Sequence, residues 1–248
     1  MKKTNHHLIT VPLEFKVACT IYKVTVQEVL QVFIDHVTLY DSICLDYSEG
    51  FYEATRTIFD FIIAKQRKPR QSRSLSACRD MAVNCTKKII ALTKKKTGEH
   101  YEKRKESQLY VTSIYMMMEH HYAPTDLIYL DENTTLQLSK DFCVICELNS
   151  CYPEEFLEDF MGRVSLADCH ARQALKIKNP NIAMCLFMKI ANGFARDNSK
   201  MLQLTELELD FYQRMEEMRL ELYIIRNLQQ RTAALQDFYL SHYQQMNA

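Results

Sequence analysis

The sequence predicts a mostly α-helical fold made of two tandem degenerate repeats, and three observations carry this prediction. The chain of 248 residues contains only 4 Gly and 5 Pro, too few for the many tight turns of a β-rich fold. Apolar residues make up 47% and charged residues 25%, as in ordinary globular domains. In addition, residues 8–41 and 135–168 align without a gap at a constant offset of 127 positions.

The two aligned stretches share nine identical residues among the 27 positions from Phe15 to Asp41. The identical pairs are Phe15/Phe142, Val17/Val144, Cys19/Cys146, Glu28/Glu155, Leu30/Leu157, Phe33/Phe160, Val37/Val164, Leu39/Leu166 and Asp41/Asp168. We therefore expect two related halves, residues 1–124 and 125–248, which pack either separately or as one pseudo-symmetric domain.

The two halves carry opposite charge. Residues 1–124 contain 19 Lys and Arg against 13 Asp and Glu, whereas residues 125–248 contain 12 against 18. This asymmetry indicates either that the halves dock on one another or that the basic half meets an anionic partner.

Each repeat is expected to open with a short strand and two helices. In the first repeat His7–Leu13 alternates like a strand, although Pro12 restricts it to an edge or an end. Glu14–Lys23 has helical spacing, and Thr25 with Glu28 forms a capping box at the start of a second helix.

The second repeat follows the same plan. Thr134–Ser139 alternates like a strand, and Pro153 occupies the first position of the helix that matches the capped one. A hinge is expected around Tyr122–Asn133, where Pro124 and an acidic cluster interrupt the pattern.

Long helices are expected to close each half as a bundle. The expected helices are Phe51–Ala64, Leu75–Lys96 and Glu99–His121 in the first half, and Asn181–Phe194 in the second. Met201–Met246 contains no Gly or Pro, so we expect one very long helix or two with a bend near Gln229–Thr232.

The sequence contains no recognisable catalytic or cofactor motif. It lacks the glycine-rich phosphate loops and the H-E-x-x-H metal motif. Cys143 and Cys146 form a C-x-x-C, but nothing completes a zinc site, and core packing explains both residues. We expect no cofactor, no metal and no enzymatic activity, with an enzyme that has a site inside a helical bundle as the minor alternative.

Cysteine usage and hydropathy indicate a cytoplasmic protein. Nine cysteines without framework spacing are typical of free thiols in a reducing compartment. No apolar run approaches the length of a membrane helix, so we expect no membrane partner.

One basic stretch is the main candidate for contacts with nucleic acid. It is the densest run of a single charge, and such clusters neutralise phosphates or simply face solvent. Its members are Lys65, Arg67, Lys68, Arg70 and Arg73, and further lysines and an arginine follow at Lys87, Lys88, Lys94, Lys95, Lys96, Lys103, Arg104 and Lys105.

The strand, short helix, turn and capped helix of Leu8–Val37 resembles the ribbon-helix-helix family of DNA-binding proteins, with Val24–Val37 similar to the second helix of antitoxin-type members. The resemblance implies that two ribbons pair antiparallel and read the major groove. It places the reading positions at Leu8, Thr10 and Pro12 in one ribbon and at Thr135, Gln137 and Ser139 in the other. Leu8 and Pro12 depart from the polar residues that the family uses.

Two functions follow as hypotheses. The first is DNA binding through the paired ribbons, with Thr10 and Gln137 as base readers and the segment Lys65–Arg73 on phosphates. The alternative is a structural or protein-interaction module in which Met201–Met246 mediates self-association.

Overall fold

The computed structural model describes residues 9–44, 50–65, 76–120, 127–131, 133–179, 181–195 and 205–247. Within these ranges the protein is mostly helical, as predicted, with one two-stranded antiparallel sheet. The helices are α1 (Leu13–Ile21), α2 (Val26–His36), α3 (Phe51–Ala64), α5 (Arg79–Lys94), α6 (His100–Glu119), α7 (Lys140–Asn149), α8 (Pro153–Gly162), α9 (Leu166–Ala174), α10 (Ile182–Ala191), α11 (Glu206–Glu221) and α12 (Leu228–Met246), with short 3-10 turns η1 (Gly193–Ala195) and η2 (Leu222–Ile224). The strands are β1 (Leu127–Tyr129) and β2 (Thr135–Gln137).

Local sequence explains where several helices begin. The predicted capping box starts α2: Thr25 Oγ1 accepts from the Glu28 amide at 3.1 Å, and the Glu28 carboxylate accepts from the Thr25 amide at 2.8 Å. Helix α8 begins at Pro153, and the Glu155 carboxylate accepts from the Tyr152 amide at 3.1 Å. These contacts satisfy amides that a helix start leaves without intrahelical partners.

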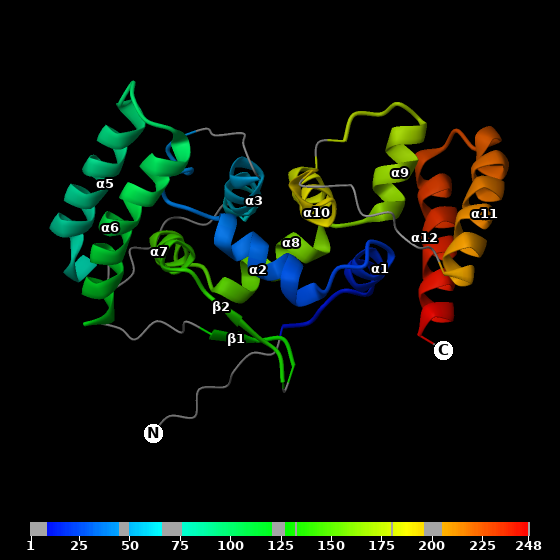
Figure 1. The fold of residues 1–248 in the computed structure, drawn as a ribbon, viewed down its shortest axis with the longest axis horizontal. Helices are drawn as coiled ribbons and strands as arrows, with labels where there is room; N and C mark the ends of the chain where they lie inside the picture. The colour runs from blue at the N-terminus through cyan, green and yellow to red at the C-terminus, as the bar shows by residue number, and fades with distance from the viewer. Residues whose placement is uncertain are drawn as a thin grey trace.

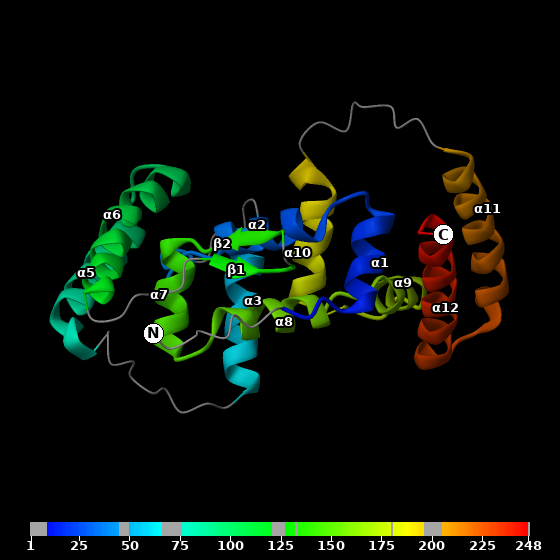
Figure 2. The ribbon, with the colours of Figure 1, turned by 90° about the horizontal axis from the view of Figure 1, so that it is seen from below.

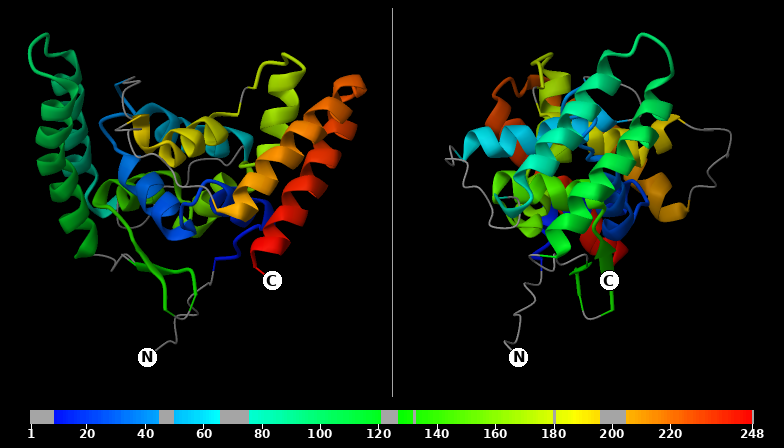
Figure 3. Two further views of the ribbon diagram at one scale, coloured as in Figure 1. Left: turned by 45° about the vertical axis from the view of Figure 1, so that its right-hand side comes forward. Right: turned by 90° about the vertical axis from the view of Figure 1, so that its left-hand side faces the viewer.

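The molecule has a central body with a helical hairpin at each end. Helices α1, α2, α3, α7, α8 and α10 form the body, and α5–α6 and α11–α12 stand at its opposite ends (Figure 1). The strands β1 and β2 lie on the side of the body away from α3 and α10 (Figure 1), and Figure 2 views the molecule from the side of the strands. In the left view of Figure 3 the body still lies between the two hairpins.

Several helices of the two halves begin at positions that differ by 127 residues, and α5 and α11 also end so. Helices α5 and α11 span residues 79–94 and 206–221, which differ by 127 at both ends. Helices α1 and α7 begin 127 positions apart, and so do α2 and α8. The offset found in the sequence therefore also relates the helices that close each half.

Equivalent aromatic residues meet at the centre of the body. Phe33 of α2 stacks on Phe160 of α8, with ring centroids 4.4 Å apart and an interplanar angle of 2°. Phe15 packs edge-on against Phe160 at 5.9 Å, and Phe142 packs edge-on against Phe33 at 6.1 Å. The two edge contacts join residues that are related by the 127-residue offset.

Each hairpin is anchored on both halves of the chain. In one hairpin, Gln108 of α6 donates to the Asp141 carboxylate of α7 at 2.6 Å. In the other, Gln236 of α12 donates to the Glu14 carboxylate of α1 at 2.5 Å, and α12 also packs along α9. Because Glu14 and Asp141 are equivalent positions, the hairpins make matching contacts with the opposite halves.

The prediction of a strand over His7–Leu13 is wrong for the residues of this stretch that the structure describes. Residues 9–12 contain no strand, and Pro12 is instead the N-cap of α1. The Ile9 amide reaches the Tyr129 carbonyl of β1 at 3.5 Å. The alternation of apolar residues here reflects a segment that enters a helix with Ile9 buried, not a ribbon.

The second expected strand is present as β2, but it pairs with β1 and not with the first repeat. Strand β1 falls in the stretch expected to be a hinge. Side chains of α2 bind the backbone of β2: Gln27 donates to the Thr135 carbonyl at 3.1 Å, and Gln31 donates to the Gln137 carbonyl at 2.9 Å. Among the described residues, β2 therefore forms a hairpin with β1 in place of the expected ribbon pair. The side chains of Gln27 and Gln31 cover its other edge.

The prediction of one helix over Met201–Met246 is also wrong. Helix α11 ends at Glu221, and residues 222–227 turn the chain into α12. The alternative with two helices is correct, although the bend lies before Gln229. Asn227 Oδ1 accepts from the Gln230 amide at 3.0 Å, and this N-cap starts α12.

None of the described helices is by itself long and apolar enough to cross a lipid bilayer, although the bent pair α1–α2 meets that length and composition together.

Candidate functional sites

The structure describes three of the seven residues predicted to contact nucleic acid. Thr10 and Gln137 are exposed, but no paired ribbon joins them. Lys65 Nζ lies 3.2 Å from the Glu155 carboxylate and 4.5 Å from the ring centroid of Phe61. The positive charge of Lys65 therefore already interacts with a carboxylate and an aromatic ring of the protein. The other predicted residues, Arg67, Lys68, Arg70 and Arg73, lie outside the described residues.

The C-x-x-C pair belongs to the core. Cys143 and Cys146 are both buried on α7, and burial raises the pKa of the Cys146 thiol well above its usual value. All nine cysteines are free thiols. Nowhere in the described ranges do three His, Cys, Asp or Glu side chains gather closely enough to hold a metal ion.

The end hairpins differ sharply in charge. We call residues 79–119 the basic arm and residues 206–246 the acidic arm. The basic arm has nine Lys and Arg against five Asp and Glu, whereas the acidic arm has four against seven. Their net charges are thus +4 and −3, at opposite ends of the molecule (Figure 1).

Exposed apolar side chains concentrate on the same two arms. Of the 18 exposed large apolar side chains in the described part of the chain, twelve lie there. They are Met81, Val83, Tyr101, Leu109 and Met116 on the basic arm and Leu207, Leu209, Tyr212, Leu220, Tyr223, Ile224 and Met246 on the acidic arm. Concentrated apolar exposure of this kind marks surfaces that bind other molecules.

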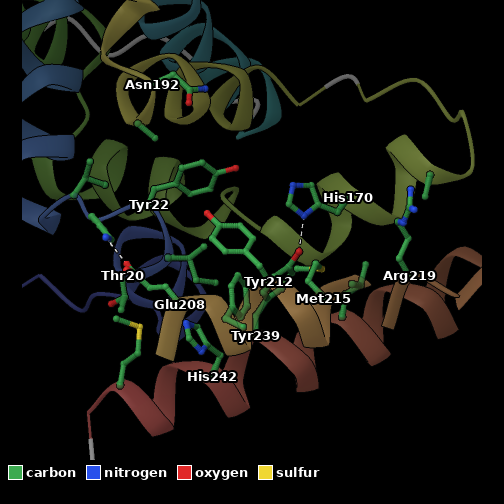
Figure 4. A pocket seen from close by; sticks show the side chains of 18 of the residues that line it. Thr20, Tyr22, His170, Asn192, Glu208, Tyr212, Met215, Arg219, Tyr239 and His242 are labelled. Atoms are coloured by element: carbon green, nitrogen blue, oxygen red, sulfur yellow. Dashed lines mark hydrogen bonds and ion pairs between the residues drawn. The ribbon is translucent and has the colours of Figure 1, made fainter. Parts of the chain in front are cut away.

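A cavity of about 810 Å³ lies where the acidic arm meets α9, the end of α1 and the end of α10. Its apolar wall includes Ile21, Ala174, Phe211, Met215, Leu222 and Leu235. Figure 4 shows Tyr22, His170 and Tyr239 facing the same space from different elements. The volume falls within the range of about 300–1,000 Å³ that small-molecule sites occupy.

Arg231 of α12 is a buried cation in the wall of this cavity. Its Nη2 donates to the Leu222 carbonyl, while its Nε has no hydrogen-bond partner. The equivalent residue of the first half, Arg104, is also buried but forms a bidentate ion pair with Asp41, at 2.7 and 3.1 Å. The residue equivalent to Asp41 is Asp168, which binds Arg172 instead.

Two histidines, His170 and His242, line the cavity. His170 Nδ1 lies 2.5 Å from the Tyr239 hydroxyl, and burial lowers the pKa of His170. His242 stacks on Phe211 with ring centroids 4.0 Å apart, and its buried Nδ1 has no partner. Burial, and then the charge of Arg214, lower the pKa of His242. Both imidazoles are therefore neutral near pH 7.

A single ion pair closes one side of the cavity. The Glu208 carboxylate binds Lys23 at the end of α1 and accepts from the Thr205 amide at 2.7 Å. The hydrogen bond from Lys23, followed by the one from the Thr205 backbone, lowers the pKa of Glu208 to about 2. Glu208 is thus ionised and already paired, so it does not neutralise Arg231.

Sequence reasoning did not identify these cavity residues as a site. The alternative of an enzyme within a helical bundle requires a pocket with converging titratable groups, and this cavity is where such chemistry would take place. One signal was present in the sequence: Arg104 and Arg231 are related by the same offset of 127.

Comparison of the chain with protein-family models, with curated proteins and with solved structures finds no match, so the assignment of function depends on the arms and the cavity themselves.

Proposed function

We propose that the protein is a non-enzymatic assembly protein that self-associates through its two arms. The observation that carries this proposal is that the hairpins at opposite ends bear opposite net charges together with most of the exposed apolar side chains. The basic arm of one copy would then meet the acidic arm of the next.

Such a contact is heterologous, because two different surfaces of the same chain meet. Contacts of this type build rings when the rotation between copies closes, and open filaments when it does not. Charge complementarity would steer the encounter and set the register, while apolar side chains such as Ile224 and Leu109 would supply the buried area. Ile224 is 81% exposed and Leu109 68% exposed, so both are available for such burial.

We also propose that the two halves are copies of one ancestral unit. The identical residues, the recurring helix bounds and the Phe33–Phe160 stack support it. Duplication explains how one chain carries two hairpins of the same design, which could then diverge in charge. A reducing, cytoplasmic compartment is part of the proposal and is supported by the nine free thiols.

Sedimentation velocity over a range of protein concentrations, at low and high salt, tests self-association. We expect oligomers at low salt that dissociate as salt screens the arms. Ile224→Ser should shift the protein toward monomer. Ile63→Ser is the matched control, because Ile63 is 64% exposed on α3, outside both arms. A monomer under all conditions, or equal effects of the two variants, would refute the proposal.

DNA binding is the second candidate function, and the basic arm favours it. Six of its lysines are exposed and free to approach phosphates: Lys87, Lys88, Lys94, Lys95, Lys96 and Lys105, of which Lys95 also contacts Glu106 at 3.3 Å. In this form of the DNA-binding hypothesis, the basic arm and the segment Lys65–Arg73 both contact phosphates. Paired ribbons take no part, because β2 pairs with β1.

A labelled mixed-sequence duplex at two salt concentrations tests this candidate. Binding should weaken with salt and fall further when Lys87, Lys88 and Lys94 are changed to Gln. Arg219→Gln with Arg226→Gln, on the acidic arm, is the control and should leave binding unchanged. Absence of binding at low salt would exclude DNA as the partner.

A further inference from the structure

The cavity beside the acidic arm contains a buried positive charge that the protein does not neutralise. Arg231 is 5% exposed, and among the described residues its hydrogen-bond acceptor is a neutral backbone carbonyl, that of Leu222. A buried cation is expensive unless an anion is close, because the low-dielectric interior does not replace its hydration. Nothing in the described part of the chain supplies a carboxylate to Arg231.

The first half shows how the same position is neutralised. There Asp41 binds both Nε and Nη2 of Arg104, and the guanidinium lies 3.5 Å from the ring centroid of Phe51. In the second half the equivalent carboxylate, that of Asp168, is partly exposed and binds Arg172 at 2.7 Å. The nitrogen that Asp41 would occupy on Arg231, Nε, is without a partner.

A second unpartnered polar atom lines the same cavity. His242 is 2% exposed, and its Nδ1 has no hydrogen-bond partner. His242 follows Arg231 by three turns of α12, so the two residues are about 16 Å apart along the helix axis and lie at different ends of the cavity. Arg231 is therefore the group that would bind an anion at its end, and His242 is a separate polar position in the wall.

The rest of the cavity wall suits an apolar body. Phe211, Met215, Leu222 and Leu235 line it, and Figure 4 shows Tyr212 and Met215 on the side of the acidic arm with Tyr22 on the opposite side. Burial of apolar ligand surface against such walls would supply most of the affinity.

We propose that this cavity binds an organic carboxylate, an apolar molecule with a single anionic head that pairs with Arg231. The proposal is independent of self-association, because it concerns the inside of the acidic arm and not its outer surface. The carboxylate takes the place that Asp41 has beside Arg104 in the first half. The site therefore selects for the charged head over a neutral head of the same size.

Isothermal titration calorimetry with decanoate and with decanol, on the full chain, tests the proposal. Decanoate should bind at least about tenfold more tightly than decanol, the preference expected from a hydrogen bond to a charged group. Equal binding of the two probes, or no binding of decanoate, would overturn the inference. This comparison uses the unmodified protein, so it does not depend on any variant folding.

Arg231→Met locates the site. This change removes the cation and keeps an apolar side chain, so it should abolish the preference for decanoate while decanol binding changes little. Arg219→Met, at the exposed rim of the cavity, is the matched control and should keep the preference. Preference retained in the Arg231 variant would place the carboxylate elsewhere and contradict the assignment.

Discussion

Asp41→Asn should destabilise the protein far more than Asp168→Asn, although the two residues occupy equivalent positions. Both amides are capped in the same way, by Thr38 at 3.0 Å and by Ser165 at 3.3 Å. Their carboxylates differ in surroundings. Asp41 is 3% exposed and pairs with the buried guanidinium of Arg104.

The magnitudes follow from these surroundings. Removing one partner of a buried ion pair costs about 3–5 kcal/mol, because the remaining charge stays buried without compensation. The Asp168 carboxylate is 32% exposed and pairs with Arg172 at i+4. An exposed pair of that kind contributes about 0.3–0.5 kcal/mol. The difference of about 3 kcal/mol is large against a typical total stability of about 5–15 kcal/mol.

Urea denaturation followed by circular dichroism measures both changes as shifts of the midpoint. The double variant Asp41→Asn with Arg104→Met should recover part of the loss, since it also removes the uncompensated cation. If the two single variants differ by less than about 1 kcal/mol, the Arg104–Asp41 pair does not stabilise the fold as its geometry indicates.

Three further predictions concern the core and the turns. Burial raises the pKa of Asp141 to about 6, above its unfolded value, so the free energy of unfolding should fall by up to about 3 kcal/mol as pH rises from about 4 to about 6. Asp141→Asn should remove this part of the pH dependence. An unchanged slope in the variant would contradict the raised pKa of Asp141. Phe33→Ala and Phe160→Ala should each cost about 3–5 kcal/mol, with a coupling of about 0.5–1.5 kcal/mol in a double-mutant cycle; additive losses would mean that the rings do not stack. Gly50→Ala should cost more than Gly98→Ala in thermal melts, because both have positive φ but only at Gly50 would the new Cβ lie 2.8 Å from the Phe194 ring.

Helix starts could be predicted from the sequence because their signals are local. The side chains of Thr25 and Glu28 each accept a hydrogen bond from the other residue's backbone amide, and Pro153 fits the first helical position whatever surrounds it. The prediction of a strand over His7–Leu13 failed because strand formation does not depend on local signals alone. Alternating apolar residues fit any segment with one buried side, and only tertiary contacts decide whether it finds a partner.

The break in the acidic arm could have been predicted from the repeat itself. Residues 95–99 separate α5 from α6, and the offset of 127 maps them onto 222–226, where α11 gives way to α12. The absence of Gly and Pro does not prevent such a break, because Asn227 supplies an N-cap and α12 starts afresh. The cavity was less accessible to sequence reasoning, since an arginine reveals its lack of a partner only in three dimensions.

Arg104 and Arg231, which the 127-residue offset relates, lie in different surroundings. Around Arg104, Tyr40 and Phe51 place aromatic rings 5.9 and 3.5 Å from the guanidinium, and Asp41 neutralises it. Position 167, equivalent to Tyr40, is an alanine, and Asp168 is bound elsewhere. In the first half the arginine is therefore buried and neutralised by a carboxylate of the protein. In the second half the corresponding arginine lies in the wall of a cavity without such a carboxylate. A buried charge of this kind is stable only if something outside the chain compensates it, and this requirement makes the cavity a stronger candidate for binding than its volume alone would.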